Sequence, residues 1–186
     1  DIEEAVHQLQ GFEDLGHSRV DLNRAERNGT AEVIYGDGKT SEQIIEIMQS
    51  LIAHQQNVLV TRINELTAEQ IIQHIPDAIY DAVPRLLRFE IKPLKKTATK
   101  VAIICAGTSD LPVAEEARIT AEFFGNTVEQ VYDAGVAGLH RLFASLDTIN
   151  SCKVVIVVAG MEGALSSVVG GLVKSPIIAV PTSVGY

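Results

Sequence analysis

Residue types that bind phosphate and hold ribose follow the first long apolar run in the second half of the chain. Gly107, Thr108, Ser109 and Asp110 come directly after the run at residues 101–106. Glycine permits a tight turn, Ser and Asp favour a helix start, and free backbone N–H groups there attract phosphate. We expect Ser109 to donate to a phosphate oxygen and Asp110 to accept from ribose hydroxyls. A plain helix-capping turn would use the same residues.

A second loop with two glycines and a basic pair follows the next apolar run. Gly135 and Gly138 would let the backbone approach a ligand closely, and His140 and Arg141 come directly after them. His140 is a candidate for proton transfer and Arg141 for phosphate binding. A surface helix that begins with an exposed His-Arg pair is the more ordinary interpretation of this loop alone.

A third loop, Gly160-Met161-Glu162-Gly163, follows the run at residues 154–159. The dipole of a following helix favours an ionised carboxylate at this place, which suits Glu162 to act as a general base or to stabilise a cation. A glutamate in the first helical turn that serves only helix stability is the alternative. A small polar loop at residues 181–185 is expected to close the floor of the same crevice.

The elements that must position these loops alternate regularly. Apolar strands are expected at residues 101–106, 127–132, 154–159 and 176–180, and helices at 111–124, 137–146 and 164–173. Continuously apolar strands between helices indicate a parallel sheet that is covered on both faces. The fold class is therefore α/β, a doubly wound three-layer domain of the flavodoxin or Rossmann type, whose ligands bind outside the carboxyl ends of the strands. Gly170 and Gly171 inside the last helix predict close helix packing, with a second subunit as one candidate neighbour.

The first half of the chain is expected to form a small α/β domain over residues 1–94, with a linker at 95–100 and the larger domain at 101–186. A capping box of Thr40 and Gln43 begins one helix, and Thr67 with Gln70 is expected to cap another. The remaining expected elements are a helix at residues 2–12, a polar stretch at 21–29, and strands at 32–36, 57–61, 78–83 and 86–91.

Composition excludes several classes of partner. The formal net charge is −9, aromatic residues make up 5% and there is no Trp, which argues against nucleic acid or an anionic membrane. No apolar run has the length of a membrane span. Cys105 and Cys152 form neither a disulfide framework nor a metal-ligand pattern, so we expect a reduced, cytoplasmic protein without a bound metal or tightly bound cofactor. The residues leave open whether Mg²⁺ assists.

The loops also carry a family resemblance. The segment from Val101 to Asp110 resembles the opening of the PurE-type aminoimidazole ribonucleotide carboxylase/mutase domain, and the segments 159–161 and 176–181 keep that order. Residues 131–142 and 158–165 resemble the LarB family more closely. Residues 21–24, 32–34 and 38–40 extend that resemblance over essentially the whole chain.

The LarB resemblance implies a defined activity. Members of this family are pyridinium-3,5-biscarboxylic acid mononucleotide synthases, which start the biosynthesis of the nickel-pincer nucleotide cofactor of lactate racemase. The implied substrates are nicotinic acid adenine dinucleotide and CO2 or bicarbonate, and hydrolysis of the phosphoanhydride releases AMP. PurE-like domains form octamers, so a homo-oligomer is implied.

The resemblance also implies roles for individual residues. Glu162 would accept the ring proton, the loop 107–110 would hold the ribose phosphate, and His140 and Arg141 would lie near the phosphates. Arg24 and Lys39 would reach the adenylate end of the ligand or brace the two domains. The substrate-binding residues expected around them are Gly107, Thr108, Ser109, Asp110, Gly135, Gly138, Gly160, Met161 and Gly163.

The family's nucleophilic cysteine is expected after Val184-Gly185-Tyr186, and we expect the native protein to continue there. Cys105 within a strand and Cys152 at the far end of another are expected to be buried structural residues. Two alternatives stay open: a PurE-type carboxylase/mutase acting on aminoimidazole ribonucleotide, against which Glu162 and the N-terminal domain argue, and a non-catalytic nucleotide-binding module.

Overall fold

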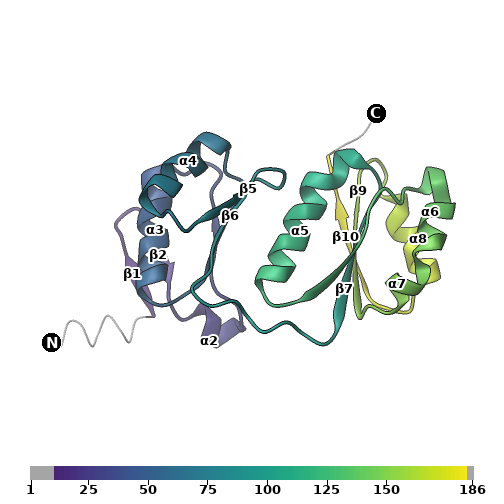
Figure 1. The fold of residues 1–186 in the computed structure, drawn as a ribbon, viewed down its shortest axis with the longest axis horizontal. Helices are drawn as coiled ribbons and strands as arrows, with labels where there is room; N and C mark the ends of the chain where they lie inside the picture. Colours follow the sequence, from purple (N-terminus) through teal and green to yellow (C-terminus); the bar gives the residue numbers. More distant parts are fainter. Residues whose placement is uncertain (1–10, 184–186) are drawn as a thin grey trace. The chain divides into compact units, whose positions relative to one another are not determined.

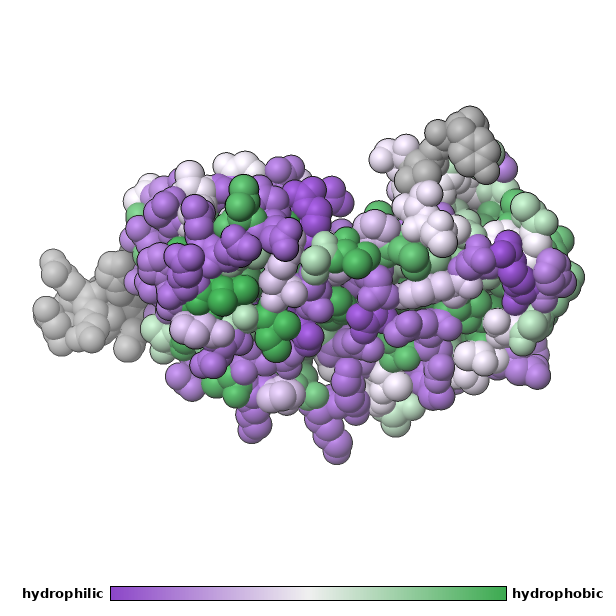
Figure 2. Space-filling view, turned by 45° about the horizontal axis from the view of Figure 1, so that its top comes forward, coloured by the Kyte–Doolittle hydropathy of each residue, from purple (hydrophilic) through white to green (hydrophobic). Residues whose placement is uncertain are grey.

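The structure is a computed structural model, and it describes residues 11–183. The chain divides into two compact units, Asp1–Pro93 and Leu94–Tyr186, each with its own hydrophobic core. Hydrophilic side chains predominate on the surface of both units in the view of Figure 2, with smaller hydrophobic patches between them. None of the helices within the described residues is long and apolar enough to cross a membrane.

Within the described residues, the N-terminal unit has a four-stranded mixed sheet, three helices and a separate two-stranded hairpin of β1 and β2. The sheet order is β3-β4-β6-β5, and β3 and β4 run parallel. Its elements are β1 (Phe12–Asp14), β2 (Arg19–Asp21), α2 (Arg24–Asn28), β3 (Val33–Tyr35), α3 (Ser41–Ala53), β4 (Val58–Thr61), α4 (Glu65–His74), β5 (Ile79–Asp81) and β6 (Leu86–Phe89). The capping box that begins α3 is confirmed, because Thr40 accepts from the Gln43 backbone and Gln43 accepts from the Thr40 backbone.

Three expectations for this unit were wrong or fall outside the described residues. Asn64, not Thr67, caps α4, because its extended backbone lets its side chain accept from the Thr67 N–H. The polar stretch at 21–29 contains the short helix α2 and ends at Gly29 in the left-handed region. Gly11 lies in a turn and Phe12 begins a strand, and residues 2–10 of the predicted helix lie outside the described residues.

The C-terminal unit is a four-stranded parallel sheet in the order β10-β9-β7-β8. Its strands are β7 (Lys100–Cys105), β8 (Thr127–Val131), β9 (Val154–Ala159) and β10 (Ile177–Pro181), and its α-helices are α5 (Leu111–Phe123), α6 (Leu139–Ala144), α7 (Leu146–Asn150) and α8 (Ala164–Leu172). Helix α5 packs on one face of the sheet and α6, α7 and α8 pack on the other (Figure 1). The predicted doubly wound α/β fold is confirmed.

The alternation of side chains along β7 builds the cores on the two faces of this sheet. Ala102 and Ile104 pack with Leu142 and Leu165 from the helices on one face, whereas Ile103 and Cys105 pack against Ala114 of α5 on the other. All of these side chains are fully or almost fully buried. A strand that is apolar from Val101 to Cys105 therefore sits between two layers of helices.

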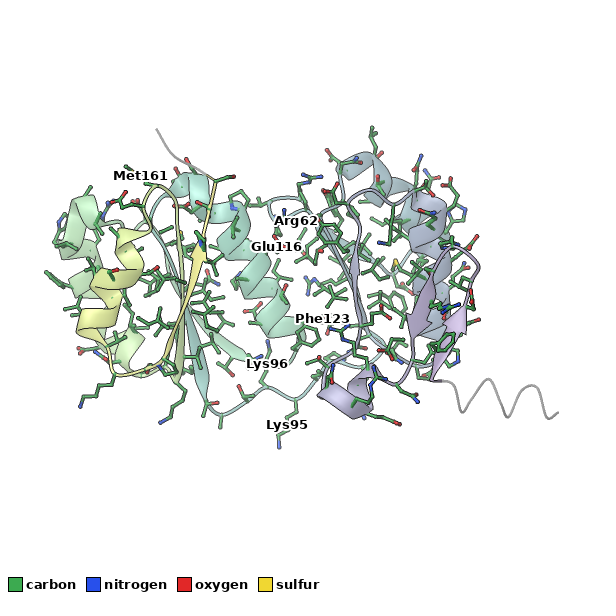
Figure 3. The ribbon with its side chains drawn as sticks, turned by 180° about the vertical axis from the view of Figure 1, so that it is seen from behind. Arg62, Lys95, Lys96, Glu116, Phe123 and Met161 are labelled. Carbon is green, nitrogen blue, oxygen red and sulfur yellow. The ribbon has the colours of Figure 1, made fainter. Side chains whose placement is uncertain are left out.

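Two local differences from the expected elements arise from turn geometry. The helix expected at 137–146 is divided into a 3-10 turn (Val136–Gly138), α6 and α7, because Ser145 leaves helical geometry with φ −103° and ψ 2°. The segment expected to be a linker at 95–100 is attached to the C-terminal unit. Thr97 exchanges hydrogen bonds with Gly125 and Thr127, Lys96 donates to the Glu122 and Asn126 carbonyls, and Lys100 begins β7 (Figure 3).

Candidate functional site

A crevice opens at the carboxyl ends of β7, β8 and β9. The chain runs from β7 to β8 on one side of β7 and then to β9 on its other side, so a topological switch point lies between β7 and β9. Open α/β sheets bind ligands at such a point. The crevice has a volume of about 330 Å³, and the loops that follow all three strands contribute to its lining. Its lining residues are Ala106, Gly107, Thr108, Ser109, Asp110, Asp133, Gly135, Val136, Ala137, Arg141, Ala159, Gly160, Met161, Glu162, Ala164 and Leu165.

Asp110 of the first loop serves the loop itself rather than presenting a free carboxylate. Its side chain is buried, and its two oxygens accept from the Gly107 N–H at 3.1 Å and from the Thr182 hydroxyl at 2.7 Å. Each oxygen thus uses one acceptor site for a donor of the protein and keeps a second lone pair. Acceptance from a ligand's ribose by Asp110, which belongs to the crevice lining, stays a prediction. Thr182 ties the loop after β10 to the loop after β7.

Ser109 and Thr108 are the exposed polar side chains of this first loop. Neither Ser109 nor Asp110 caps α5 through its side chain, so the capping role expected for them was wrong. A 3-10 turn (Thr108–Asp110) precedes α5 instead, and Pro112 lies in the first turn of that helix. The two hydroxyls therefore border the crevice without a helix-capping duty.

Gly135 brings the second loop against the first. A Cβ at this position would lie 2.8 Å from the carbonyl oxygen of Ala106, closer than real contacts allow. The adjacent Ala134 N–H donates to the Cys105 carbonyl at 3.0 Å. Backbone-to-backbone contact of this kind needs glycine, and it joins two of the loops that line the crevice.

Arg141 lies at the rim beside an acidic partner and a glycine. Its Nη1 donates to Oδ2 of Asp133 at 2.6 Å, and both side chains are about half exposed. A Cβ on Gly138 would lie 2.9 Å from both Nε and Nη2 of Arg141, so the guanidinium lies against the bare Cα of this glycine. Arg141 and Gly138 were expected site residues, whereas Asp133 was not. Its position directly after a strand, before Ala134-Gly135, was the available signal.

The third loop presents Met161 and Glu162 to the crevice. Met161 has a left-handed backbone with φ +54°, is 60% exposed, and lies at the end of the sheet between β9 and α8 (Figure 3). Glu162 is exposed and lies two residues before the first residue of α8, whose N-cap is Gly163. Glu162 therefore lies in the loop between the two glycines, as in the main expectation, and not in the first helical turn, which was the alternative. Its exposed carboxylate belongs to the crevice lining.

Several expected site residues lie away from the lining. His140 is exposed on α6, and Gly138 and Gly163 shape the loops without lining the crevice themselves. Arg24 is exposed on α2 of the N-terminal unit, and Lys39 of the same unit donates to the Tyr35 carbonyl at 2.8 Å. A proton-transfer role for His140 in this crevice therefore has no support from its position.

The crevice has one apolar wall and one polar rim. Val136 and Met161 are exposed apolar side chains, and Ala137 and Leu165 extend the same wall. Flat heteroaromatic rings bind well against such surfaces, and a polarisable thioether is suited to the contact. The ionisable groups exposed in the lining are Asp133, Arg141 and Glu162.

Neither cysteine lies in the crevice lining. Cys105 points into the core beside α5, and Cys152 lies before β9, at the opposite end of the sheet. Burial raises the pKa of both thiols, which disfavours the thiolate that a nucleophile requires. Their expected place as buried side chains is confirmed.

Comparisons with known proteins agree with this geometry. Residues 12–92 match the family described as the LarB/PurE-like N-terminal domain, and residues 100–186 match AIR carboxylase. The chain belongs to the LarB family. An uncharacterized protein of Methanocaldococcus jannaschii is 40% identical to it over 184 residues, covering 90% of this chain and 69% of that protein. The chain is thus a LarB-family member with a PurE-like C-terminal domain, related to carboxylases.

Proposed function

We propose that this LarB-family protein carboxylates the pyridinium ring of nicotinic acid adenine dinucleotide and hydrolyses its phosphoanhydride, in the pathway to the nickel-pincer nucleotide cofactor. The products are AMP and pyridinium-3,5-biscarboxylic acid mononucleotide, and CO2 or bicarbonate supplies the new carboxylate. The observation that carries the proposal is the composition of the crevice. One exposed glutamate in a loop, an apolar wall and one arginine meet at the ends of three strands.

The ring chemistry needs a nucleophile and a base. A pyridinium ring is electron-poor and does not attack CO2, but addition of a nucleophile turns it into an electron-rich dihydropyridine. A ring carbon then forms a bond to CO2, Glu162 takes the proton from that carbon, and departure of the nucleophile restores the aromatic cation. The proposal assigns the nucleophile to neither Cys105 nor Cys152, because both are buried away from the crevice.

The crevice volume is suited to the mononucleotide half of the substrate. A volume of about 330 Å³ is near the lower end of small-molecule sites, so the adenylate half would extend beyond it. The ring would lie against Val136 and Met161. The phosphate nearest the ring would meet Arg141 and the hydroxyls of Thr108 and Ser109.

The proposal extends to the setting in which the protein works. Two free cysteines suit a reducing compartment, so we assign the protein to the cytoplasm. A homo-oligomer, an octamer by family resemblance, is the assembly we expect, and analytical ultracentrifugation of the full-length protein measures it. Adding EDTA to the turnover assay shows whether Mg²⁺ takes part.

Turnover of the full-length protein tests the activity. We expect incubation with nicotinic acid adenine dinucleotide and ¹³C-bicarbonate to release AMP and to give a labelled pyridinium product, followed by mass spectrometry. Glu162→Gln should lower kcat by about 100-fold or more while the substrate Kd changes little, because a general base acts on the chemical step. Glu69→Gln, on the exposed surface of α4, is the matched control.

Two results would contradict the proposal. Turnover of aminoimidazole ribonucleotide with none of the dinucleotide would assign the protein to the PurE-type reaction. Binding of the dinucleotide without any turnover by the full-length protein would leave a nucleotide-binding module. Unchanged kcat in Glu162→Gln would remove this residue from the mechanism.

A further inference from the structure

The carboxylate of Asp133 competes with any anionic ligand in the crevice for the guanidinium of Arg141. The pair has an Nη1–Oδ2 distance of 2.6 Å, and both residues belong to the lining. Within the described residues, the carboxylate of Asp133 forms an ion pair with the guanidinium of Arg141. A phosphate that enters the crevice must therefore share Arg141 with Asp133.

The position of the pair is fixed by the backbone of the second loop. Asp133 has φ +56°, a left-handed conformation that Asp and Asn adopt more readily than most residues. The next residue, Ala134, is buried and hydrogen-bonded to Cys105 of β7. The guanidinium of Arg141 lies against Gly138, where any Cβ would collide with it. The backbone thus places Asp133 at the rim, where it meets Arg141 as a half-exposed ion pair.

Charge at the crevice favours a particular kind of ligand. Its lining exposes two carboxylates, of Asp133 and Glu162, against one cation, Arg141. A phosphorylated ligand with a neutral ring would add negative charge to the crevice and would supply no positive charge to either carboxylate. In a phosphorylated ligand whose ring carries a fixed positive charge, the phosphate would bind Arg141 and the cationic ring would compensate the charge of the carboxylates.

We propose that Asp133 is a specificity-determining residue that makes the crevice select phosphorylated ligands with a cationic ring over the same ligands with a neutral ring. This inference rests on the proposed function, whose pyridinium substrate belongs to the selected class. It adds the residue responsible and predicts discrimination by ring charge alone. Asp133 does this as a counter-charge, separately from the proton transfer assigned to Glu162.

A matched pair of ligands isolates ring charge. Nicotinamide mononucleotide has a pyridinium ring, and its dihydro form has the same ribose phosphate with a neutral ring. We expect the full-length protein to bind the oxidised form about tenfold more tightly, measured by isothermal titration calorimetry at constant salt. Asp133→Asn should bring the two dissociation constants to within about twofold and strengthen the binding of inorganic phosphate.

The substitution is chosen to keep the backbone. Asn tolerates the left-handed region as Asp does, so Asp133→Asn removes charge with little change of conformation. Asp147→Asn, on the exposed surface of α7 and outside the lining, is the control and should leave the preference unchanged. If circular dichroism shows that Asp133→Asn has lost its fold, Asp133→Gly replaces it, because glycine also accepts positive φ.

Each outcome separates this inference from the proposed function. Equal binding of the two forms by the wild type, or an unchanged preference in both Asp133 variants, would overturn the role of Asp133 while leaving turnover of the dinucleotide intact. A preference that depends on Asp133 without any carboxylation would keep the inference and reject the proposed activity. Failure of both mononucleotides to bind would reject the inference outright, and the turnover assay would then decide the activity alone.

Discussion

Asp110 shows how a side chain at a ligand crevice can serve structure first. It is 5% exposed and accepts from Gly107 in its own loop and from Thr182 in the loop after β10. A buried acceptor that loses its bonds, or a buried donor that loses its acceptor, costs the desolvation energy of the unpaired group. Asp110 therefore links two crevice loops, and its removal acts on stability before it acts on binding.

Substitution of Asp110 separates these effects. Asp110→Ala should lower the free energy of unfolding by about 2 kcal/mol, because it leaves the Gly107 N–H and the Thr182 hydroxyl without their acceptor. Asp110→Asn should cost less than about 1 kcal/mol, since the amide oxygen can accept from Gly107 and its NH2 can donate to the Thr182 hydroxyl. Urea unfolding measures both.

Ser109→Ala provides the control for this loop. Its side chain is exposed and caps no helix, so stability should change by less than about 0.5 kcal/mol. Equal unfolding midpoints for Asp110→Ala and the wild type would mean that the two hydrogen bonds contribute nothing to the fold.

At the residue scale, the sequence could not predict side-chain hydrogen bonds between residues that are far apart in the chain. Asp110 and Thr182 are 72 positions apart, and no local pattern links them. The type of residue at 110 was consistent with ribose binding, and only the fold shows that its oxygens point to Gly107 and Thr182. Asp133 was missed for a related reason. Its proposed role depends on its ion pair with Arg141, which lies eight residues later in the first turn of α6.

At the scale of elements, the loops after β7 and β8 depend on a close contact at Gly135. We expect Gly135→Ala to destabilise the protein by about 1–3 kcal/mol, because the new methyl would overlap the Ala106 carbonyl oxygen, a backbone atom that cannot swing aside. It should also weaken dinucleotide binding, as both loops line the crevice. Thermal unfolding and calorimetry measure the two effects.

Gly171→Ala is the opposite case within the same unit. A Cβ there meets nothing within 4 Å, and Gly171 is an exposed residue of α8. Alanine should therefore stabilise the isolated chain by about 0.5–1 kcal/mol through its helix propensity. A loss of stability at Gly171, or none at Gly135, would contradict these assignments.

These glycines also correct an expectation from the sequence. Gly170 and Gly171 were expected to allow close packing, yet a Cβ on Gly170 would make only an ordinary contact with Ile177 at 3.6 Å. Nothing within the described chain requires either glycine. A neighbouring subunit is still a proposal for what they contact.

Strong apolar runs made most of the C-terminal elements predictable. The strand at residues 154–159 was predicted to the residue, because six apolar residues lie between Lys153 and Gly160. The hairpin of β1 and β2 was missed, since each strand has three residues and little alternation. The break between α6 and α7 was also missed, because the apolar spacing continues across Ser145 while the backbone does not.

At the scale of the whole molecule, the net charge of −9 reflects an excess of carboxylates, whose protonation determines how stability changes in acid. Most carboxylates are at the surface, but Glu115 of α5 accepts from Arg118 at 2.7 Å and from the Tyr132 hydroxyl at 2.6 Å. The hydrogen bond from Arg118 is the main reason that the pKa of Glu115 is lowered, with a further contribution from Tyr132. This network joins α5 to the end of β8.

The sign of the pH effect follows from that lowered pKa. The unfolded chain takes up the Glu115 proton at higher pH than the folded chain, so stability is present above about pH 4.5 and is lost as pH falls through the folded pKa. We expect Glu115→Gln to flatten the loss of stability between about pH 5 and pH 3, measured as the urea midpoint at each pH. Glu69→Gln should keep the wild-type slope, and an equal slope for Glu115→Gln would contradict the assignment.

The left-handed backbone of Asp133 limits which residues can occupy the position in any descendant of this sequence. Asp, Asn and Gly accept φ +56° without strain, and they give the crevice rim an anionic, a neutral polar or an absent side chain. Two charge states of the rim, −1 and 0, are thus available while the loop keeps its shape. Directed evolution toward nucleotides of another charge should begin at position 133, because a single substitution there changes the charge preference of the crevice and keeps the backbone of the loop.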